Sequence, residues 1–165
     1  MVAKAINLYL ASPLGFSEAG REFMYDQIIP LIKVHNFNVI DPWKLTPKKL
    51  IQEVAEMPYS TAKKQKWQEV NHIIGKNNQY ALEGASGLIA ILDGTDVDSG
   101  TAAEIGYMAA LGKPILGYRG DFRLASDNEG CQVNLQVEYF IRKSGGTIVD
   151  KLNDIPKHLK LFHGR

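Results

Sequence analysis

The sequence predicts an α/β fold in which one parallel sheet carries helices on both faces. Short apolar segments of strand length recur along the chain, at residues 5–11, 37–40, 87–92, 115–118 and 147–149. Segments with apolar residues at helical spacing lie between them, as in chains that alternate strand and helix. The third apolar segment, GLIAIL, is apolar throughout, which is expected for a strand buried on both faces. Together these observations indicate a sheet of five parallel strands.

Composition places the chain among soluble globular proteins. Its 165 residues fit one domain spanning residues 1–165. A hydrophobic share of 45% and a charged share of 22% exclude disorder, collagen and coiled coil as descriptions of the whole chain. The net charge of +1 gives no reason to expect nucleic acid or an anionic membrane as a partner. The single cysteine, Cys131, excludes an internal disulfide and suits a reducing cytoplasm.

The first predicted strand, residues 5–11, ends at Ser12-Pro13, because a serine–proline pair favours a loop. The apolar start of the chain is much shorter than the ~20 residues that a membrane span needs, so we expect neither a signal peptide nor a membrane partner. Ser17 is suited to cap a helix whose apolar residues recur at helical spacing. Pro30 lies inside that helical pattern and is expected to kink it.

The middle of the chain is predicted to be mainly helical. A second strand is predicted over residues 37–40 and ends at Asp41-Pro42. Residues 44–66 contain two prolines and a lysine cluster, and they are the one stretch that we expect to be weakly ordered. A long helix is predicted over residues 62–84, although Gly75 weakens the helical pattern at its middle.

The second half of the chain alternates strand and helix at short intervals. Its predicted elements are a strand at 87–92, a helix at 100–111, a strand at 115–118, a helix at 135–143, a strand at 147–149 and a terminal helix at 154–162. Such alternation implies right-handed crossovers, and five strands in this arrangement suggest a flavodoxin-like single domain. Ligands in such sheets bind at the carboxyl ends of the strands, which here means the loops after Tyr9, Leu92 and Tyr118.

The loop after residues 87–92 is the richest in chemically useful side chains. It reads DGTDVDSG and passes into a helix that carries Glu104 in its first or second turn. The positive end of the helix dipole and the free N–H groups favour an ionised carboxylate there, and such a carboxylate could attack a carbon electrophile. The alternative is structural: Asp98, Ser99 or Thr101 caps the helix, and Glu104 only complements its dipole.

At these residues the chain resembles the nucleoside 2-deoxyribosyltransferases. The resemblance lies in DGTDVDSGTAAEIGY at residues 93–107 and ALGKP at 110–114. It is supported by LYLASPLGF at 8–16, DFR at 121–123 and NL at 134–135, and it extends over about residues 5–140. Deoxynucleotide N-hydrolases share the fold and the glutamate, so the motif is more specific to the superfamily than to one member.

The resemblance implies a double displacement at C1′ of a 2′-deoxyribose. Glu104 matches the nucleophile, which displaces the nucleobase and holds the sugar as an ester until a second base captures it. Ping-pong kinetics would follow. The implied partners are 2′-deoxynucleosides and free nucleobases. No metal or other cofactor is expected, because the four histidines show no ligand spacing with one another or with cysteine.

Three further residues match positions of the family near the glutamate. Tyr9 matches a tyrosine that orients the glutamate, and its alternative role is core packing. Asp98 matches an aspartate that contacts the base and can hold or donate a proton if its neighbours raise its pKa; its alternative role is the helix N-cap. Phe16 matches an aromatic residue that stacks on the base, and its alternative is a hydrophobic staple for the first helix.

Three other residues complete the expected site. Asn78 stands where the family commonly has a second aspartate, and asparagine can bind a base through hydrogen bonds but cannot supply a proton as an acid does. Gly100, inside the motif, is expected to contact substrate. Asn134 matches an asparagine that reaches the sugar 5′-hydroxyl of a neighbouring subunit, which implies a homo-oligomer, a dimer or larger, with shared active sites. Its alternative role is to cap the next helix.

Three functions therefore remain open on the sequence. The leading one is transfer of 2-deoxyribose between nucleobases. The second is hydrolysis of deoxynucleoside 5′-monophosphates, with phosphate at the start of the helix after Asp98 and help from Arg119 or Arg123. The aspartate-rich loop disfavours it, since its charge would repel a phosphate dianion. The third is a nucleoside-binding module without turnover, which only the asparagine at position 78 encourages, while Glu104 and Tyr9 argue against it.

Overall fold

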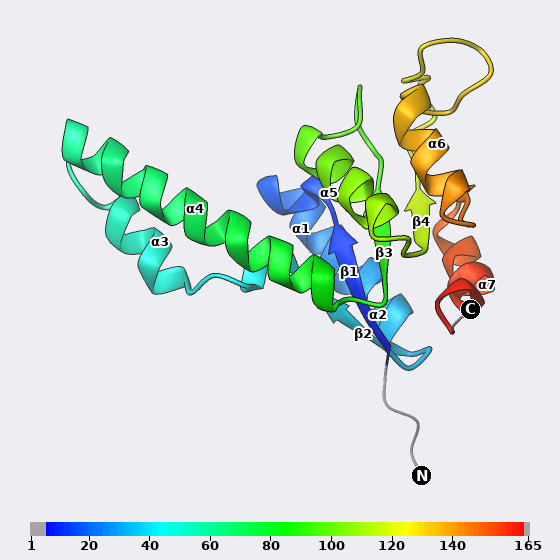
Figure 1. Ribbon diagram of the computed structural model, residues 1–165, viewed down its shortest axis with the longest axis horizontal. Coiled ribbons are helices and arrows are strands. Elements are labelled where there is room, and N and C mark those ends of the chain that lie inside the picture. The colour runs from blue at the N-terminus through cyan, green and yellow to red at the C-terminus, as the bar shows by residue number, and fades with distance from the viewer. Residues whose placement is uncertain (1–5, 164–165) are drawn as a thin grey trace.

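The computed structural model describes residues 6–163 and contains one five-stranded sheet (Figure 1). Its strands are β1 (Ile6–Ala11), β2 (Phe37–Ile40), β3 (Gly87–Ile91), β4 (Ile115–Tyr118) and β5 (Ile148–Val149). They lie in the order β2-β1-β3-β4-β5, and every neighbouring pair is parallel. This is the flavodoxin-like order, so the predicted fold class is confirmed. Ala5, the first residue of the predicted first strand, lies outside the described residues.

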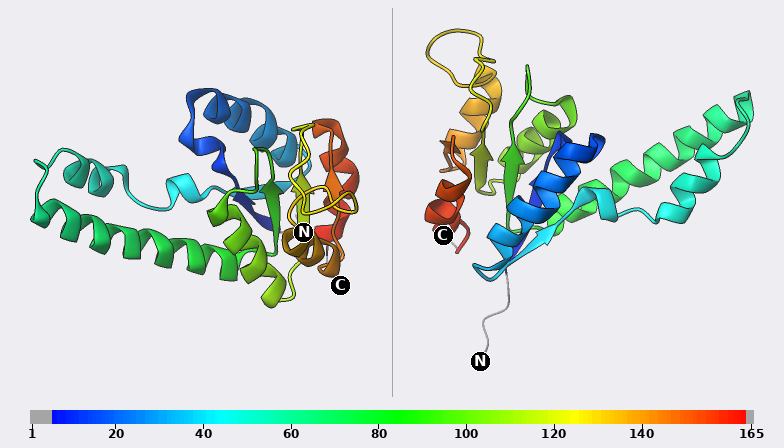
Figure 2. Two further views of the ribbon diagram at one scale, coloured as in Figure 1. Left: turned by 90° about the horizontal axis from the view of Figure 1, so that it is seen from above. Right: turned by 180° about the vertical axis from the view of Figure 1, so that it is seen from behind.

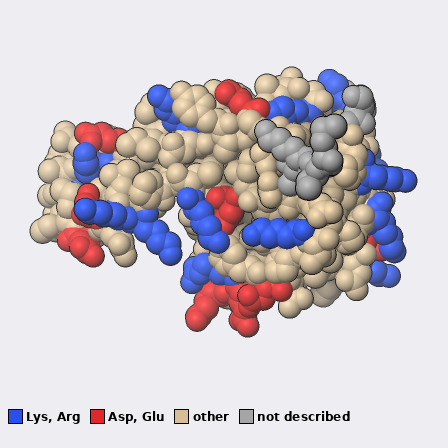
Figure 3. Space-filling model, turned by 90° about the horizontal axis from the view of Figure 1, so that it is seen from below, with Lys and Arg blue, Asp and Glu red and all other residues tan. Residues whose placement is uncertain are grey.

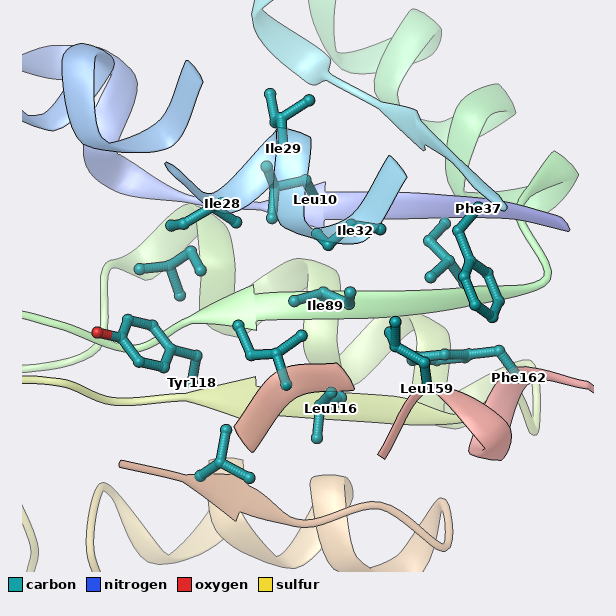
Figure 4. Close-up of a cluster of buried hydrophobic side chains, with 14 of the residues drawn as sticks. Leu10, Ile28, Ile29, Ile32, Phe37, Ile89, Leu116, Tyr118, Leu159 and Phe162 are labelled. Carbon is teal, nitrogen blue, oxygen red and sulfur yellow. The ribbon is translucent and has the colours of Figure 1, made fainter. Parts of the chain in front are cut away.

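One face of the sheet is covered by helical segments from both ends of the chain. They are α1 (Glu18–Phe23), η2 (Met24–Ile28), α2 (Ile29–Lys33), α7 (Ile155–His158) and η5 (Leu159–Phe162). Figure 4 shows side chains of these segments, among them Ile28 and Phe162, packed with Leu10 and Ile89 of the sheet. The terminal helix predicted over 154–162 is present as the short α-helix α7 with a 3-10 turn on each side, as helix ends often form.

The other face is covered by α4 (Thr61–Gly84), α5 (Ser99–Ala110) and α6 (Leu135–Lys143). Successive side chains of a strand point to opposite faces, so Leu8 and Leu10 face the first layer of helices whereas Tyr9 and Ala11 face the second. Strand parity therefore directs the ring of Tyr9 toward the layer that contains α5, the helix that carries Glu104.

The kink expected at Pro30 takes the form of a π-helical segment just before it. The N–H of Ile29 bonds to the carbonyl of Met24, five residues back. Pro30 has no N–H, so it cannot form the α-helical bond to the carbonyl of Asp26. The wider π turn absorbs this interruption while Ile28, Ile29 and Ile32 remain buried against the sheet.

The helices α3 (Lys48–Ala55) and α4 form an arm that extends away from the sheet (Figures 1 and 2). The expectation of weak order over residues 44–66 is wrong, because α3 occupies its middle. Val54 of α3 is buried, and Lys63 donates hydrogen bonds to the carbonyls of Ala55 and Met57, at 2.6 and 2.7 Å. Lys63 thus ties the end of α3 to α4. The long helix predicted over 62–84 is confirmed and passes through Gly75 without a break.

Charge is mixed on the face that carries the amino ends of the strands. Figure 3 shows Lys and Arg side chains lying among Asp and Glu there, rather than in a field of one sign. Within residues 6–163, no helix combines the length and the apolar character that crossing a bilayer requires.

Candidate active site

The carboxylate of Glu104 lies beside the hydroxyl of Tyr9. Glu104 is in the second turn of α5, half-buried, and Tyr9 is on β1 with its side chain fully buried. The Tyr9 hydroxyl donates a hydrogen bond to Oε1 of Glu104 over 2.5 Å. Residues 95 positions apart are joined in this way because β1 and β3 are neighbours and α5 follows β3.

Burial sets the protonation of this pair. It raises the pKa of Glu104 to about 7; the charge of Asp98 acts in the same direction, and the hydrogen bond from Tyr9 acts against both. Burial and the neighbouring Glu104 also raise the pKa of Tyr9, so its hydroxyl keeps its proton and remains a donor. The site therefore holds a carboxyl group that titrates near neutral pH beside a permanent hydrogen-bond donor.

Asp98 caps α5 and also lines the cleft beside Glu104. Its Oδ2 accepts hydrogen bonds from the N–H of Thr101 at 2.9 Å and from the Thr101 hydroxyl at 3.2 Å. The capping role that the sequence offered as an alternative is thus present. Both bonds use Oδ2, so the second carboxylate oxygen is not needed for capping, and one side chain can cap the helix and still face a ligand.

A cleft of about 410 Å³ opens in front of Glu104. It lies beyond the carboxyl ends of β1, β2 and β3, where ligands are expected in this type of sheet. Its walls come from the segments after these strands and from α4. The lining residues are Ser12, Phe16, Pro42, Trp43, Asn71, Ile74, Asn78, Asp98, Gly100, Thr101 and Glu104. Phe16, Asn78, Asp98, Gly100 and Glu104, which the sequence predicted, are thus brought together.

Phe16 lines the cleft, and most of its side chain is exposed. It ends the 3-10 turn η1 (Pro13–Phe16), and its side chain is 73% exposed, which is too exposed for a hydrophobic staple. Its ring meets the ring of Trp43 edge to face, with 4.6 Å between centroids. The two rings form an aromatic corner of the cleft, which we define as Phe16 and Trp43.

Asn78 has an unsatisfied polar atom in the site. Its Oδ1 is buried, and no described residue donates a hydrogen bond to it. A buried acceptor without a partner costs about 1–3 kcal/mol of stability, so a ligand or a water molecule that donates to it would be bound favourably. Asn78 and Glu104 also line a second cavity of about 300 Å³ between α4 and α5, which adjoins the cleft. Both positions fit a residue that binds a ligand.

Asn134 does not reach this cleft within one chain. Its side-chain oxygen caps α6 by accepting from the N–H groups of Gln136 at 3.0 Å and Val137 at 3.4 Å. The cavity that it lines is formed instead with residues of two loops, Thr95, Asp96, Ala125, Ser126 and Asp127. The capping role that the sequence gives as the alternative for Asn134 is thus present.

Trp43 is the main site residue that sequence reasoning missed. Its backbone N–H donates to Oδ1 of Asp41 at 3.0 Å, and the hydroxyl of Tyr25 donates to Oδ2 of the same carboxylate at 2.8 Å. Burial and this bond raise the pKa of Tyr25 to about 12. The sequence does point to this position, because residues 41–43 directly follow the strand predicted at 37–40, and ligands bind at strand ends in such sheets.

The arginines that could have held a phosphate are engaged elsewhere. Arg119 is buried and donates to the carbonyls of Leu92, Gly94 and Arg123, and Arg123 is paired with Asp121. Among the described residues that line the Glu104 cleft, none is Lys or Arg. The charges in the cleft are those of Glu104 and Asp98, which favours a neutral ligand over a phosphate dianion.

The family model described as nucleoside 2-deoxyribosyltransferase matches residues 8–136, and the chain belongs to this family. This agrees with a flavodoxin-like sheet in which Tyr9 of β1 donates a hydrogen bond to Glu104 of α5, the helix that follows β3. None of the curated proteins compared with the chain matches it significantly.

Solved structures agree with this assignment at the level of the fold. A 2-deoxyribosyltransferase from Bacillus psychrosaccharolyticus superposes with a TM-score of 0.64 at 20% identity, over 94% of this chain and 95% of its own. The 2-desoxiribosyltransferase from Leishmania mexicana gives 0.61 at 22%, over 95% and 96%. A CMP N-glycosidase from Clostridium botulinum gives 0.54 at 18%, over 94% and 98%. The fold is therefore common to transferases and N-glycosidases.

The raised pKa of Glu104 predicts that this side chain reduces stability at alkaline pH. The folded protein binds the carboxyl proton more tightly than the unfolded chain, so the free energy of unfolding falls as pH rises from about 4.5 through about 7. Glu104→Gln keeps the size and the acceptor for Tyr9 but carries no charge. We expect it to stabilise the protein at pH 8, by an amount on the order of 1 kcal/mol.

Urea unfolding of both proteins at pH 4 and pH 8 measures this effect. The advantage of Glu104→Gln over wild type should be greater at pH 8 than at pH 4. An equal difference at the two pH values would mean that Glu104 ionises as freely in the folded protein as in the unfolded chain.

Proposed function

We propose that this protein transfers 2-deoxyribose between nucleobases through a covalent glutamyl-deoxyribose intermediate. The observation that carries the proposal is the Glu104 carboxylate, held by Tyr9 at 2.5 Å and open to a cleft of about 410 Å³. A cleft of this volume lies within the usual range for small-molecule sites. Family membership makes nucleosides and nucleobases the natural substrates.

The chemistry would be a double displacement at C1′. Tyr9 donates to Oε1 of Glu104, so Oε2 is the oxygen suited to attack. As the bond from Oε2 to C1′ forms, the bond from C1′ to the base nitrogen breaks, and the base leaves with its bonding electrons and takes up a proton. A second base then attacks C1′ through a ring nitrogen, loses its proton and releases the carboxylate. Two inversions retain the configuration at C1′.

Proton supply to the leaving base falls to Asp98 or to water. Asp98 lines the cleft with one carboxylate oxygen not needed for capping, and Asn78 cannot act as an acid. Proton transfer by a positioned side chain typically contributes about 10²–10⁴-fold to a rate. In this proposal Asn78 contributes by binding the base rather than by protonating it.

The competing function is hydrolysis of a nucleotide N-glycosidic bond, and the likeness to a CMP N-glycosidase is the observation that favours it. Transfer is preferred because the lining residues of the cleft include two carboxylates and, within the described part of the chain, no Lys or Arg to bind a 5′-phosphate. A binding module without turnover would have no use for a buried carboxylate whose ionisation costs stability.

We further propose that the enzyme is a homo-oligomer in which Asn134 completes the site of a neighbouring subunit. Capping occupies its side-chain oxygen and leaves the amide N–H groups to donate to a sugar hydroxyl. Large apolar side chains near it are exposed, with Phe122 at 96%, Leu124 at 82% and Leu135 at 47%. Such side chains are suited to burial against a second copy of the chain.

The first functional prediction concerns the nucleophile. When the protein is incubated with deoxyinosine and either adenine or cytosine, it should form the new deoxynucleoside and hypoxanthine. Chromatography measures both products. Glu104→Ala should lower the transfer rate by about three orders of magnitude or more, since each tenfold loss needs only about 1.4 kcal/mol of barrier. Tyr80→Ala, on the exposed side of α4, is the control and should transfer normally.

Two outcomes would contradict the proposal. A Glu104→Ala variant that keeps a tenth of wild-type activity would exclude Glu104 as the nucleophile. Release of base from a deoxynucleoside 5′-monophosphate, without transfer from the matching deoxynucleoside, would favour the hydrolase.

A second prediction concerns the role of Tyr9 as a positioning residue. Its hydrogen bond lowers the pKa of Glu104, so Tyr9→Phe should raise that pKa further. The acid limb of kcat/KM, expected near pH 7 in the wild type, should move to higher pH by about one unit, the equivalent of one hydrogen bond to a charged group. Tyr80→Phe should leave the profile in place. A fall in activity without a shift of the acid limb would indicate a purely structural role for Tyr9.

A third prediction tests the shared site by mixing inactive variants. Glu104→Ala chains and Asn134→Ala chains, when co-assembled, should form some pockets with both native residues and should partly recover activity. Asn134→Ala alone should lose about 2–4 kcal/mol of transition-state stabilisation if its amide bonds the sugar. Full activity of a demonstrated monomer, or no recovery in confirmed mixed oligomers, would show that Asn134 serves only its own chain.

A further inference from the structure

One face of α4 presents an ordered pattern of side chains to the cleft. Asn71, Ile74 and Asn78 line it, at positions i, i+3 and i+7, which fall on one side of a helix. An apolar side chain is thus flanked by two amides. Seen from above, α4 and the segment after β2 run side by side (Figure 2), so this stripe and the aromatic corner form two sides of one cleft.

The aromatic corner is fixed before any ligand arrives. Trp43 is held through its backbone by Asp41, and its indole N–H points to the carbonyl of Ser12 at 3.4 Å. Gly15 lies directly against the indole: a Cβ atom at this position would be 2.0 Å from Cε2 of Trp43. The ring therefore needs glycine at position 15 in order to lie where it does, and little ordering of Trp43 would be required on binding.

We propose that Trp43 and Asn71 make this cleft selective for purine bases, a proposal that rests on the function proposed above. The aromatic corner and Ile74 line the same cleft, and a base that stacks on the corner buries more area there when it has two rings than when it has one. The two amides of α4 can each donate to and accept from the polar edge of a base, as asparagine does with adenine.

The spacing of the two amides is what favours two rings over one. Residues seven positions apart on a helix are separated by about 10.5 Å along its axis. A bicyclic base reaches further along α4 than a monocyclic one, so a purine can engage Asn71 and Asn78 together. A pyrimidine leaves one amide without a partner and stacks less area on Trp43. The buried Oδ1 of Asn78, which lacks a partner in the described chain, shows that the amide has capacity for a ligand donor.

The inference is tested by comparing bases across matched variants. Wild type should cleave deoxyinosine and deoxyadenosine with kcat/KM about tenfold above deoxycytidine and thymidine. Trp43→Leu should lower the purine values about tenfold, whereas Trp67→Leu, the other tryptophan and not part of the cleft, should not. Asn71→Ala should lower the purine values about fivefold and hardly change the pyrimidine values. Gln68→Ala, an exposed amide on the same helix, is its control.

Asn71→Ala is expected to fold, since alanine favours a helix more than asparagine does. Binding provides a readout that needs no turnover: in a Glu104→Gln, Trp67→Phe protein, adenine should quench the fluorescence of Trp43 at lower concentration than cytosine. Equal affinity for the two bases, or equal losses on all nucleosides in Asn71→Ala, would overturn the inference. Tighter binding of adenine without turnover of any nucleoside would support the purine selectivity of the cleft and contradict the proposed transferase activity. Turnover of purine and pyrimidine nucleosides at equal rates would support the transferase activity and contradict the purine selectivity.

Discussion

The hydrogen bond between Tyr9 and Glu104 depends on strand order and strand parity together. Tyr9 faces the layer of α4, α5 and α6 because its neighbours Leu8 and Leu10 face the opposite core. A shift of one residue in β1 would bury the hydroxyl in the other cluster and leave Glu104 without its donor. The pairing of β1 with β3, Tyr9 beside Leu88, fixes this register. The pair is thus a property of the sheet as well as of two side chains.

The same pair lowers the stability of the fold when Glu104 is ionised. A carboxyl group whose pKa rises to about 7 by burial is poorly solvated when ionised, and Asp98 adds to the penalty. Natural proteins keep such groups where function requires them. Helix α4 contributes to the burial, because it closes one side of the cleft, and its far end extends beyond the sheet (Figure 2).

Much of the fold could be predicted because its boundaries are marked locally. The strand at 115–118 follows Lys113-Pro114, and the helix at 135–143 begins after the capping Asn134; both elements have the predicted bounds. Helix α3 could not be predicted, since the prolines and lysines around it suggest a loop. It is held in place by packing on α4 and by the hydrogen bonds of Lys63. Glu104 could be predicted, because it lies in the motif at residues 93–107. Asn71 could not be predicted, because the cleft that it shares with Trp43 forms only when α4 lies beside the segment after β2.

Charge in the cleft bears on the choice between a nucleoside and a nucleotide. Glu104 and Asp98 are close enough for Asp98 to influence the ionisation of Glu104, so both act on anything bound between them. A phosphate dianion brought near them would need basic side chains to offset the repulsion, and Arg119 is already committed to three backbone carbonyls. Freeing it would break three hydrogen bonds, and the one to the Leu92 carbonyl is buried. Among the described residues that line the cleft, none is a basic residue that could supply this charge. A neutral deoxynucleoside needs none, which supports the proposed nucleoside substrate over a nucleotide.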